Sequence, residues 1–228
     1  MSLIESPTQP NVQMEVDPTF QAARITMRPL EFKGPNGSNI GGHYRTVATT
    51  GATTVLAAGA PMFSARWANP DRACVLSRIR VGTTVGTAFG AAQEVSCDLV
   101  RVYNMANADT GGTAITLGDA GRKSRQTMQP TVMSDLRVCG AAALAGGAGN
   151  TEEAAPLAWQ PMNGLLNVVG SMALGILYEF RPGHEGPLIV MRNEGFRIRN
   201  RTLMGAAGVV VWTFELDWVE VPTALLGL

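Results

Sequence analysis

Few residues of this chain belong to the types that carry out chemistry. Histidine is the commonest general base and metal ligand in proteins, and the chain has two, His43 and His184. Neither lies near a carboxylate pair or a cysteine at ligand spacing, so we expect both in surface loops. Glu152 and Glu153 are adjacent, and adjacent side chains of an extended chain point apart. This acidic pair therefore predicts a solvated turn rather than an acid–base pair.

Residues 118–124, Gly-Asp-Ala-Gly-Arg-Lys-Ser, end as a phosphate-binding loop does. Such a loop needs the spacing Gly-x4-Gly-Lys-Ser/Thr and an amphipathic helix behind it. This segment has neither feature, so we expect no bound nucleotide. Taken with the two histidines, the pattern predicts a protein that is not an enzyme and holds no metal and no cofactor.

The chain has three cysteines, Cys74, Cys97 and Cys139. Their number is odd, no pair has the Cys-x-x-Cys spacing, and no histidine lies near them. The pattern therefore indicates neither a disulfide framework nor a zinc site. Cys74 and Cys97 lie in alternating apolar runs, where a free cysteine behaves as a small buried hydrophobe. Free thiols fit folding in a reducing cytoplasm.

One constellation of charge stands out near the C-terminus. Arg197, Arg199 and Arg201 alternate with Phe196 and Ile198, so the arginines line one face of a predicted strand. Like charges in such a row repel, and the row therefore requires carboxylate or carbonyl partners. We treat these three arginines as candidate interface residues.

Two arrangements would supply those partners. Glu215 and Asp217 lie on the polar face of the next predicted strand, and they would form cross-strand salt bridges if the two strands pair. The alternative is a subunit interface, where the forked geometry of arginine is favoured. Arg78 and Arg80 form a smaller version of the same pattern.

Short runs of alternating apolar and polar residues position these side chains. Alternation at period two is typical of strands, because successive side chains point to opposite faces of a sheet. In the clearest run, 209–221, Trp212, Phe214 and Trp218 share one face. The expected strands are 43–54, 61–67, 73–85, 93–103, 113–117, 132–138, 175–180, 188–191, 195–201 and 209–221.

Residues 141–149 are rich in alanine and glycine, and we expect a loop there rather than a helix. About ten short strands without helical periods between them are typical of an all-β fold. The sequence thus predicts a β-sandwich, with the jelly roll as the preferred topology.

The composition indicates a protein with much of its surface covered by neighbours. Charged residues make up 16% of the chain and the formal net charge is +0, whereas about a quarter of residues are charged in an ordinary protein. Proteins free in solution usually keep their net charge away from zero. The balance also argues against nucleic acid, which requires a basic excess. We expect no membrane partner and no leader, since no apolar run is long enough.

The first residues are expected to form an extended N-terminal arm, 1–42, because proline and glycine oppose independent folding. Pro7, Pro10, Pro18 and Phe20 are its candidate interface residues. The arm could reach a neighbouring subunit or wrap around its own domain. The expected domains are then the arm 1–42, the β-sandwich 43–221 and a C-terminal tail 222–228.

The C-terminal residues 193–201 and 212–221 resemble the ending of a group of tailed-bacteriophage virion proteins. Residues 61–81 and the turn 109–112 (Asp-Thr-Gly-Gly) are also similar to that group. The resemblance covers roughly residues 45–221 and consists of strand and turn patterns rather than functional motifs. It implies a jelly-roll or sandwich fold of the capsid cement, or decoration, type, in which subunits sit as trimers or sometimes dimers.

What the resemblance implies is a structural protein that binds and stabilises the capsid lattice from the capsid exterior of the virion. Its partners would be the major capsid protein and further copies of itself, a trimer being preferred to a dimer, and it would be made in the host cytoplasm. The alternatives are a tail, baseplate or fibre-base component, and a glycan-binding β-sandwich module. A glycan site would need an exposed aromatic ring; Trp67, Trp212 and Trp218 fall on expected core faces and Trp159 in a loop.

Overall fold

The computed structural model describes residues 3–6, 9–16, 23–24, 32–33, 39–91, 93–117, 130–133, 135–162, 168–181 and 186–225. The chain divides into two units, residues 1–30 and 31–228. In the first unit, three strands form an antiparallel sheet in the order β1-β2-β3: Leu3–Ser6, Gln9–Val16 and Ala23–Arg24. The predicted boundary between arm and sandwich at residue 42 stays a prediction.

The second unit is a β-sandwich of two antiparallel sheets, as the sequence predicts. Sheet I has the order β11-β8-β15-β6-β10-β9, and β12 also pairs with β8. Its strands are β6 (Pro61–Trp67), β8 (Ser96–Asn104), β9 (Thr113–Ala114), β10 (Asp135–Val138), β11 (Thr151–Glu152), β12 (Ala158–Pro161) and β15 (Glu194–Asn200).

Sheet II has the order β13-β7-β16-β5-β4, and β14 also pairs with β7. Its strands are β4 (Phe32–Lys33), β5 (Asn39–Thr49), β7 (Arg72–Thr87), β13 (Met172–Glu179), β14 (Leu188–Val190) and β16 (Val209–Pro222). A short 3-10 turn, Thr223–Leu225, follows β16, and no α-helix is present in the described part of the chain. The jelly-roll topology stays a prediction.

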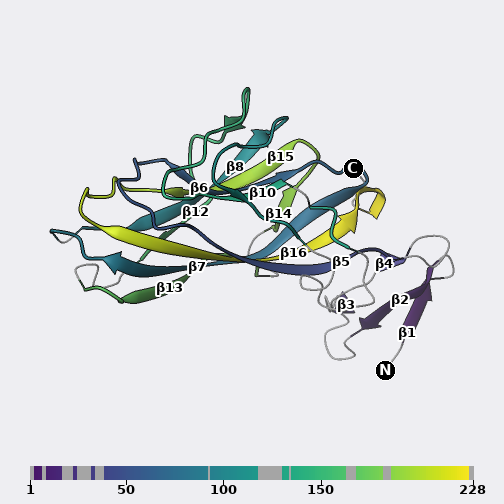
Figure 1. Ribbon diagram of the computed structural model, residues 1–228. Coiled ribbons are helices and arrows are strands. Elements are labelled where there is room, and N and C mark those ends of the chain that lie inside the picture. Colours follow the sequence, from purple (N-terminus) through teal and green to yellow (C-terminus); the bar gives the residue numbers. More distant parts are fainter. Residues whose placement is uncertain are drawn as a thin grey trace. The chain divides into compact units, whose positions relative to one another are not determined.

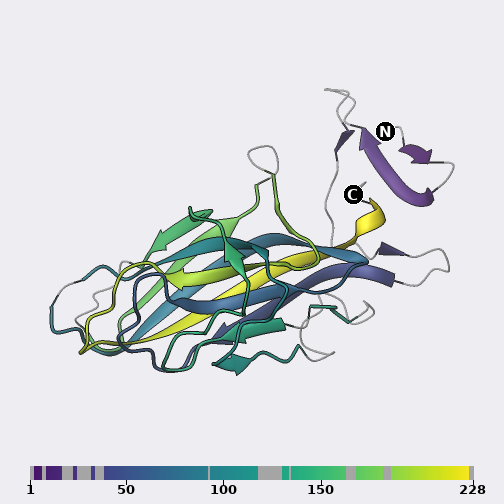
Figure 2. The same ribbon diagram turned by 90° about the horizontal axis from the view of Figure 1, so that it is seen from above.

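Side chains from both sheets form one core between them. Phe63 of β6 and Phe196 of β15 stack at 6.2 Å between ring centroids, and Phe63 meets Phe214 of β16 at 5.5 Å. Trp212 and Trp218 are fully buried on the same face of β16. Figure 1 shows β8, β15 and β6 in one layer with β7, β16 and β5 in the other, and Figure 2 views these strands from above. The apolar face predicted for residues 209–221 is confirmed.

The two sheets differ in what lies on their outer faces. On sheet I, Arg197 and its outward-facing neighbours Ser64 and Val100 are all buried. Chain segments that leave the sheet after β8 and after β10 cover them, and Met105 lies so close to Gly195 that a methyl group there would collide with it. On sheet II, by contrast, outward-facing apolar side chains of β13 are exposed. Within the described ranges, sheet I therefore has its own cover, and the β13 side of sheet II has none.

Candidate functional site

The arginine row occupies the centre of sheet I. β15 lies between β8 and β6, with Arg197 in register with Val100 on one side and Ser64 on the other. Phe196 and Ile198 point into the core, so period-two alternation directs Arg197 outward, under the segments that cover this sheet. Only 5% of Arg197 is exposed. A full positive charge is thus held in the interior, where it requires close carboxylate partners.

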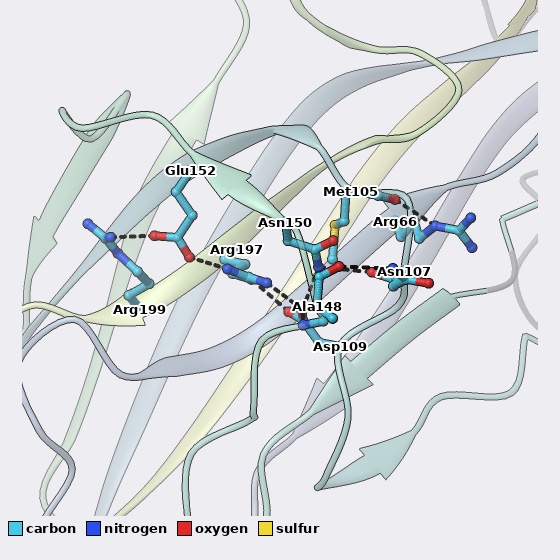
Figure 3. Close-up of polar contacts among 10 residues, drawn as sticks. Arg66, Met105, Asn107, Asp109, Ala148, Asn150, Glu152, Arg197 and Arg199 are labelled. Carbon is cyan, nitrogen blue, oxygen red and sulfur yellow. Dashed lines mark hydrogen bonds and ion pairs between the residues drawn. The ribbon is translucent and has the colours of Figure 1, made fainter.

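Two carboxylates neutralise Arg197. Its Nε donates to Oδ2 of Asp109 at 2.6 Å, and its Nη2 donates to the other oxygen of that carboxylate. Its Nη1 donates to Oε1 of Glu152. The bond pair to Asp109 is bidentate, which is the strongest geometry open to an arginine. Figure 3 shows Glu152 between Arg197 and Arg199, with Asp109 on the other side of Arg197.

Asp109 is also held by the covering segments. The backbone N–H of Gly147 donates to its Oδ1 at 2.9 Å, and Nδ2 of Asn150 lies 3.2 Å from the same oxygen. Burial acts to raise the pKa of Asp109, but the hydrogen bonds from Arg197 and Gly147 and the charge of Arg197 outweigh it, so the pKa lies below its ordinary value. The ionised carboxylate therefore ties the turn after β8 to the loop before β11.

The other two arginines have different surroundings. Arg199 donates from Nη1 to Oε2 of Glu152 at 2.7 Å and from Nη2 to Oδ2 of Asp98 at 3.2 Å. Arg201 lies over the ring of Trp159, with 4.6 Å from its Cζ to the ring centroid. Both Arg201 and Trp159 are exposed. The row therefore changes from a buried ion pair at Arg197, within β15, to an exposed cation–π contact at Arg201, just after the strand ends.

The predicted pairing of the row with Glu215 and Asp217 is wrong. β15 and β16 belong to different sheets, and their outer faces point away from each other. Glu215 instead accepts from Arg80 at 2.9 Å, and Asp217 accepts from Arg78 at 2.6 Å across β16 and β7. The smaller arginine pattern is thus the one that forms cross-strand salt bridges with these carboxylates.

Three further expectations about single residues are wrong. Glu152 was expected in a solvated turn, but it lies in β11 and bridges Arg197 and Arg199. His43 lies in β5 rather than in a loop, and burial lowers its pKa. Trp159 lies in β12, a short strand paired with β8.

A second buried carboxylate escaped the sequence-based reasoning. Glu220, near the end of β16, is fully buried. It accepts from Nη1 of Arg72 at 3.0 Å and from the backbone N–H of Val132 at 3.0 Å, and also from the hydroxyl of Thr131. Burial raises the pKa of Glu220 above its ordinary value despite these donors. Alternation continued from Trp218 places Glu220 on the buried face of β16, and that position is the signal that could have revealed it.

Arg197 and Arg199 together with Asp109, Glu152 and Asp98 form an arginine–carboxylate cluster. This arginine–carboxylate cluster holds the cover of sheet I in place. Both buried arginines are paired with carboxylates of the same chain, so the arrangement fixes the covering loops. In the described ranges, no three His, Cys, Asp or Glu side chains gather as metal ligands would, and no helix is long and apolar enough to cross a membrane. Of the arm candidates, Pro10 lies in β2, whereas Pro7, Pro18 and Phe20 lie outside the described residues.

Among the described residues, the outer face of sheet II carries an exposed apolar surface instead of a cover. We define the β13 face as Met172, Leu174 and Ile176 together with Val47, Gly82 and Thr213. A hollow of about 330 Å³ lies at this face and is lined in part by Val47, Gly82 and Leu174. The face is apolar and open, which makes it the candidate contact surface of the molecule.

Comparisons with known proteins give little to add to this geometry. No protein-family model matches the chain, and no curated protein does. Two solved structures overlap it weakly. The structure of infectious bursal disease virus, Gx strain, is 11% identical over 94% of this chain and 46% of that one, with a TM-score of 0.18. A crystal structure of a T13 particle of this virus is 12% identical over 96% and 45%, with a TM-score of 0.16. The chain spans about half the length of these two chains, and overlaps this weak carry no argument about function.

Proposed function

We propose that the chain is a structural protein of a virus particle, and specifically that it binds the outside of a bacteriophage capsid and stabilises its lattice. The two segments that resemble phage virion proteins, 193–201 and 212–221, form most of β15 and β16. These strands are central in their sheets, so the resemblance concerns the framework of the sandwich. It supports a shared kind of structure rather than a shared active site.

The observation that carries the proposal is the unequal covering of the two sheets. Sheet I is closed by its own loops, which Arg197 and Asp109 hold down. Sheet II leaves the apolar β13 face open, in a chain whose formal net charge is +0. An open apolar face on a molecule without net charge favours association, because little electrostatic repulsion opposes contact. Such a molecule is suited to a place in an assembly.

Stabilisation of a shell follows from repetition. A single contact of moderate strength is multiplied when many copies bind one lattice, so the assembled shell resists expansion far better than one contact would allow. The arm 1–42 and the tail 222–228 would clasp neighbouring subunits of the major capsid protein. Of the arginine row, Arg201 is the exposed member and would reach a partner, whereas Arg197 and Arg199 are occupied by carboxylates.

The test is co-sedimentation of the purified full chain with expanded empty capsids. We expect saturable binding at a copy number comparable to that of the major capsid protein, and weaker binding after removal of residues 1–30, which form the first unit and whose loss leaves the strands of the sandwich intact. Absence of binding would reject the capsid role. Detection of the protein in tails, at a few copies per particle, would instead favour the tail, baseplate or fibre-base alternative.

One observation favours a second candidate, a glycan-binding module. Trp159 is exposed on β12, and Arg201 covers one face of its ring. An exposed indole ring offers a flat apolar face on which a sugar ring can stack, and polar neighbours can bond to the sugar hydroxyls. Quenching or enhancement of tryptophan fluorescence by host-surface polysaccharide, lost in Trp159→Ala, would support this role. An unchanged spectrum at saturating polysaccharide would reject it.

A further inference from the structure

A row of exposed apolar side chains runs along the edge strand of sheet II. Met172, Leu174 and Ile176 are exposed to 76%, 73% and 47%, and β13 is the end strand of the sheet order. Residues 168–178 contain no charged side chain. Edge strands of free monomers usually carry charges that prevent contact with other chains. The one charge of β13 is that of Glu179 at its C-terminal end, so the apolar part of this edge lacks that protection, which indicates that another molecule covers it.

The row stands beside a hollow on the same surface. Val47 of β5, Gly82 of β7 and Thr213 of β16 line it, and Met172 and Leu174 of the row form part of its wall. Gly82 contributes no side chain, and Cδ1 of Leu174 lies 3.8 Å from the position that a Cβ of Gly82 would take. A row that forms one wall of a hollow can fit against a second copy of itself, because a twofold rotation places the row of each copy against the hollow of the other.

The charges of this surface also fit a second copy. Arg80 and Glu215, which border the hollow, pair with each other at 2.9 Å. The two charges that border the hollow therefore cancel, whereas a contact with an excess of one sign would repel its own copy. A basic or acidic partner would gain nothing here from long-range attraction. The balanced charges and the row beside the hollow together favour a second copy of this chain as the molecule that covers the face.

We infer that the β13 face is a homotypic contact, in which two copies pack with Leu174 and Met172 of each over the hollow at Gly82 of the other. This contact deepens the proposed function by naming how copies join, and it forms in the absence of a capsid. It is isologous and produces a dimer, rather than the trimer that the family resemblance implies.

The first experiment measures association of the full chain by sedimentation equilibrium. We expect a dimer, and we expect Leu174→Lys to raise the dissociation constant by about 30-fold or more, since it places a charge at the centre of a desolvated contact. Leu203→Lys is the matched control, because Leu203 is 65% exposed, lies in the segment after β15 of sheet I and is not among the residues that line the hollow. Circular dichroism checks that both variants fold.

A monomer at all concentrations, or equal effects of the two substitutions, would overturn the inference. A chain lacking residues 1–30 separates the remaining occupants. If the full chain is monomeric and the shortened chain dimerises, the N-terminal unit covers the face and the homotypic contact is wrong for the intact protein. If Leu174→Lys leaves the wild-type oligomer intact but abolishes capsid binding, the face belongs to the capsid contact and the inference is again overturned.

Cross-linking tests the geometry independently of affinity. The three native cysteines are buried, so Leu174→Cys adds a single accessible thiol near the twofold axis. A short bismaleimide should convert this variant into a covalent dimer at low protein concentration, and Leu203→Cys should remain monomeric. A covalent dimer from both variants, or from neither, would contradict the contact. Failure of capsid binding alone would leave this result unchanged, so the two proposals fail separately.

Discussion

Arg197 illustrates how one residue fixes the cover of a sheet. Its guanidinium is buried and bonded to Asp109 and Glu152, so removal of a partner leaves a charge that water cannot reach. We expect Asp109→Ala to lower the free energy of unfolding by about 3 kcal/mol, at the low end for a broken buried pair because Glu152 remains. Urea unfolding followed by tryptophan fluorescence measures this change.

The matched comparison is an exposed ion pair. Arg181 and Glu179 lie 3.0 Å apart, with the Arg181 side chain 70% exposed. Arg181→Ala should change the free energy of unfolding by less than about 1 kcal/mol, because solvent screens surface pairs. Equal losses in the two variants would show that burial of Arg197 adds nothing to the strength of its pairs.

Asp217 gives the protein a defined acid dependence. Burial acts to raise its pKa, but hydrogen bonds from Arg45 and Arg78 and their charges outweigh it, so the folded-state pKa lies below 3.8. A lowered folded pKa means that the stabilisation is present above the unfolded pKa and is lost as the pH falls through the folded one. The stability difference between wild type and Asp217→Asn should therefore be largest near neutral pH and shrink below 3.8.

Glu220 acts with the opposite sign. Burial raises its folded-state pKa above 4.5, so its contribution is fully present below that value and is lost as the pH rises through the folded pKa. The wild-type profile contains both effects, and only the difference from Asp217→Asn isolates the aspartate. Urea unfolding of both proteins across the acidic range tests the prediction, and a difference that is constant with pH would contradict it.

At the scale of elements, the sequence predicts where the strands lie better than it predicts which segments pack against them. The run 61–67 coincides with β6 and the run 209–221 lies within β16, because alternation is a local property. Partner choice is not local. The carboxylate of Asp109 sits 88 residues from Arg197 along the chain, in a stretch without periodicity, so only the unpaired arginine row gave a sign that such a group must exist. Glu152 was misjudged for the same reason.

Close packing of the cover on β15 depends on one glycine. An added Cβ at Gly195 would collide with the carbonyl oxygen of Ala65 and the sulfur of Met105, and the first of these is backbone that cannot rotate away. We expect Gly195→Ala to lower the free energy of unfolding by about 2 kcal/mol, as overpacking does. Gly86→Ala is the control, since a Cβ there meets Val209 at an ordinary 3.5 Å.

Thermal unfolding of both variants measures the two effects side by side. The strand interior favours alanine over glycine at Gly86, so this control should be neutral or slightly stabilised. If Gly195→Ala unfolds at the wild-type temperature, the segment carrying Met105 does not lie against β15 in solution, and the cover of sheet I is looser than the contacts indicate.

At the scale of the whole molecule, one core joins two unlike outer faces. The phenylalanine contacts between sheets make the sandwich a single unit, while the cluster closes sheet I and the β13 face stays open. This asymmetry could not be predicted from the sequence, because Leu174 and Val100 lie in similar alternating apolar runs. What distinguishes them is whether a distant segment folds over the strand.

The buried thiols report whether the sandwich unfolds as one unit. Cys74 lies in β7 of sheet II and Cys97 in β8 of sheet I, while Cys139 follows β10. All three are buried, and burial raises the pKa of Cys97 and of Cys139 to about 12. Near pH 8 they should stay protonated and unreactive, because the thiolate is the nucleophile. Because the two sheets share one core, each thiol should become reactive only when the whole sandwich opens.

Labelling with an aromatic disulfide, followed by mass spectrometry of the modified peptides, gives the rate for each cysteine. The three rates, corrected for intrinsic reactivity, should yield one protection free energy equal to that from urea unfolding. Leu203→Cys supplies the unprotected reference, because Leu203 is 65% exposed and lies outside the β13 face. Faster labelling of Cys97 and Cys139 than of Cys74 would mean that sheet I opens alone. The arginine–carboxylate cluster would then close a layer that moves independently, instead of completing a single cooperative core.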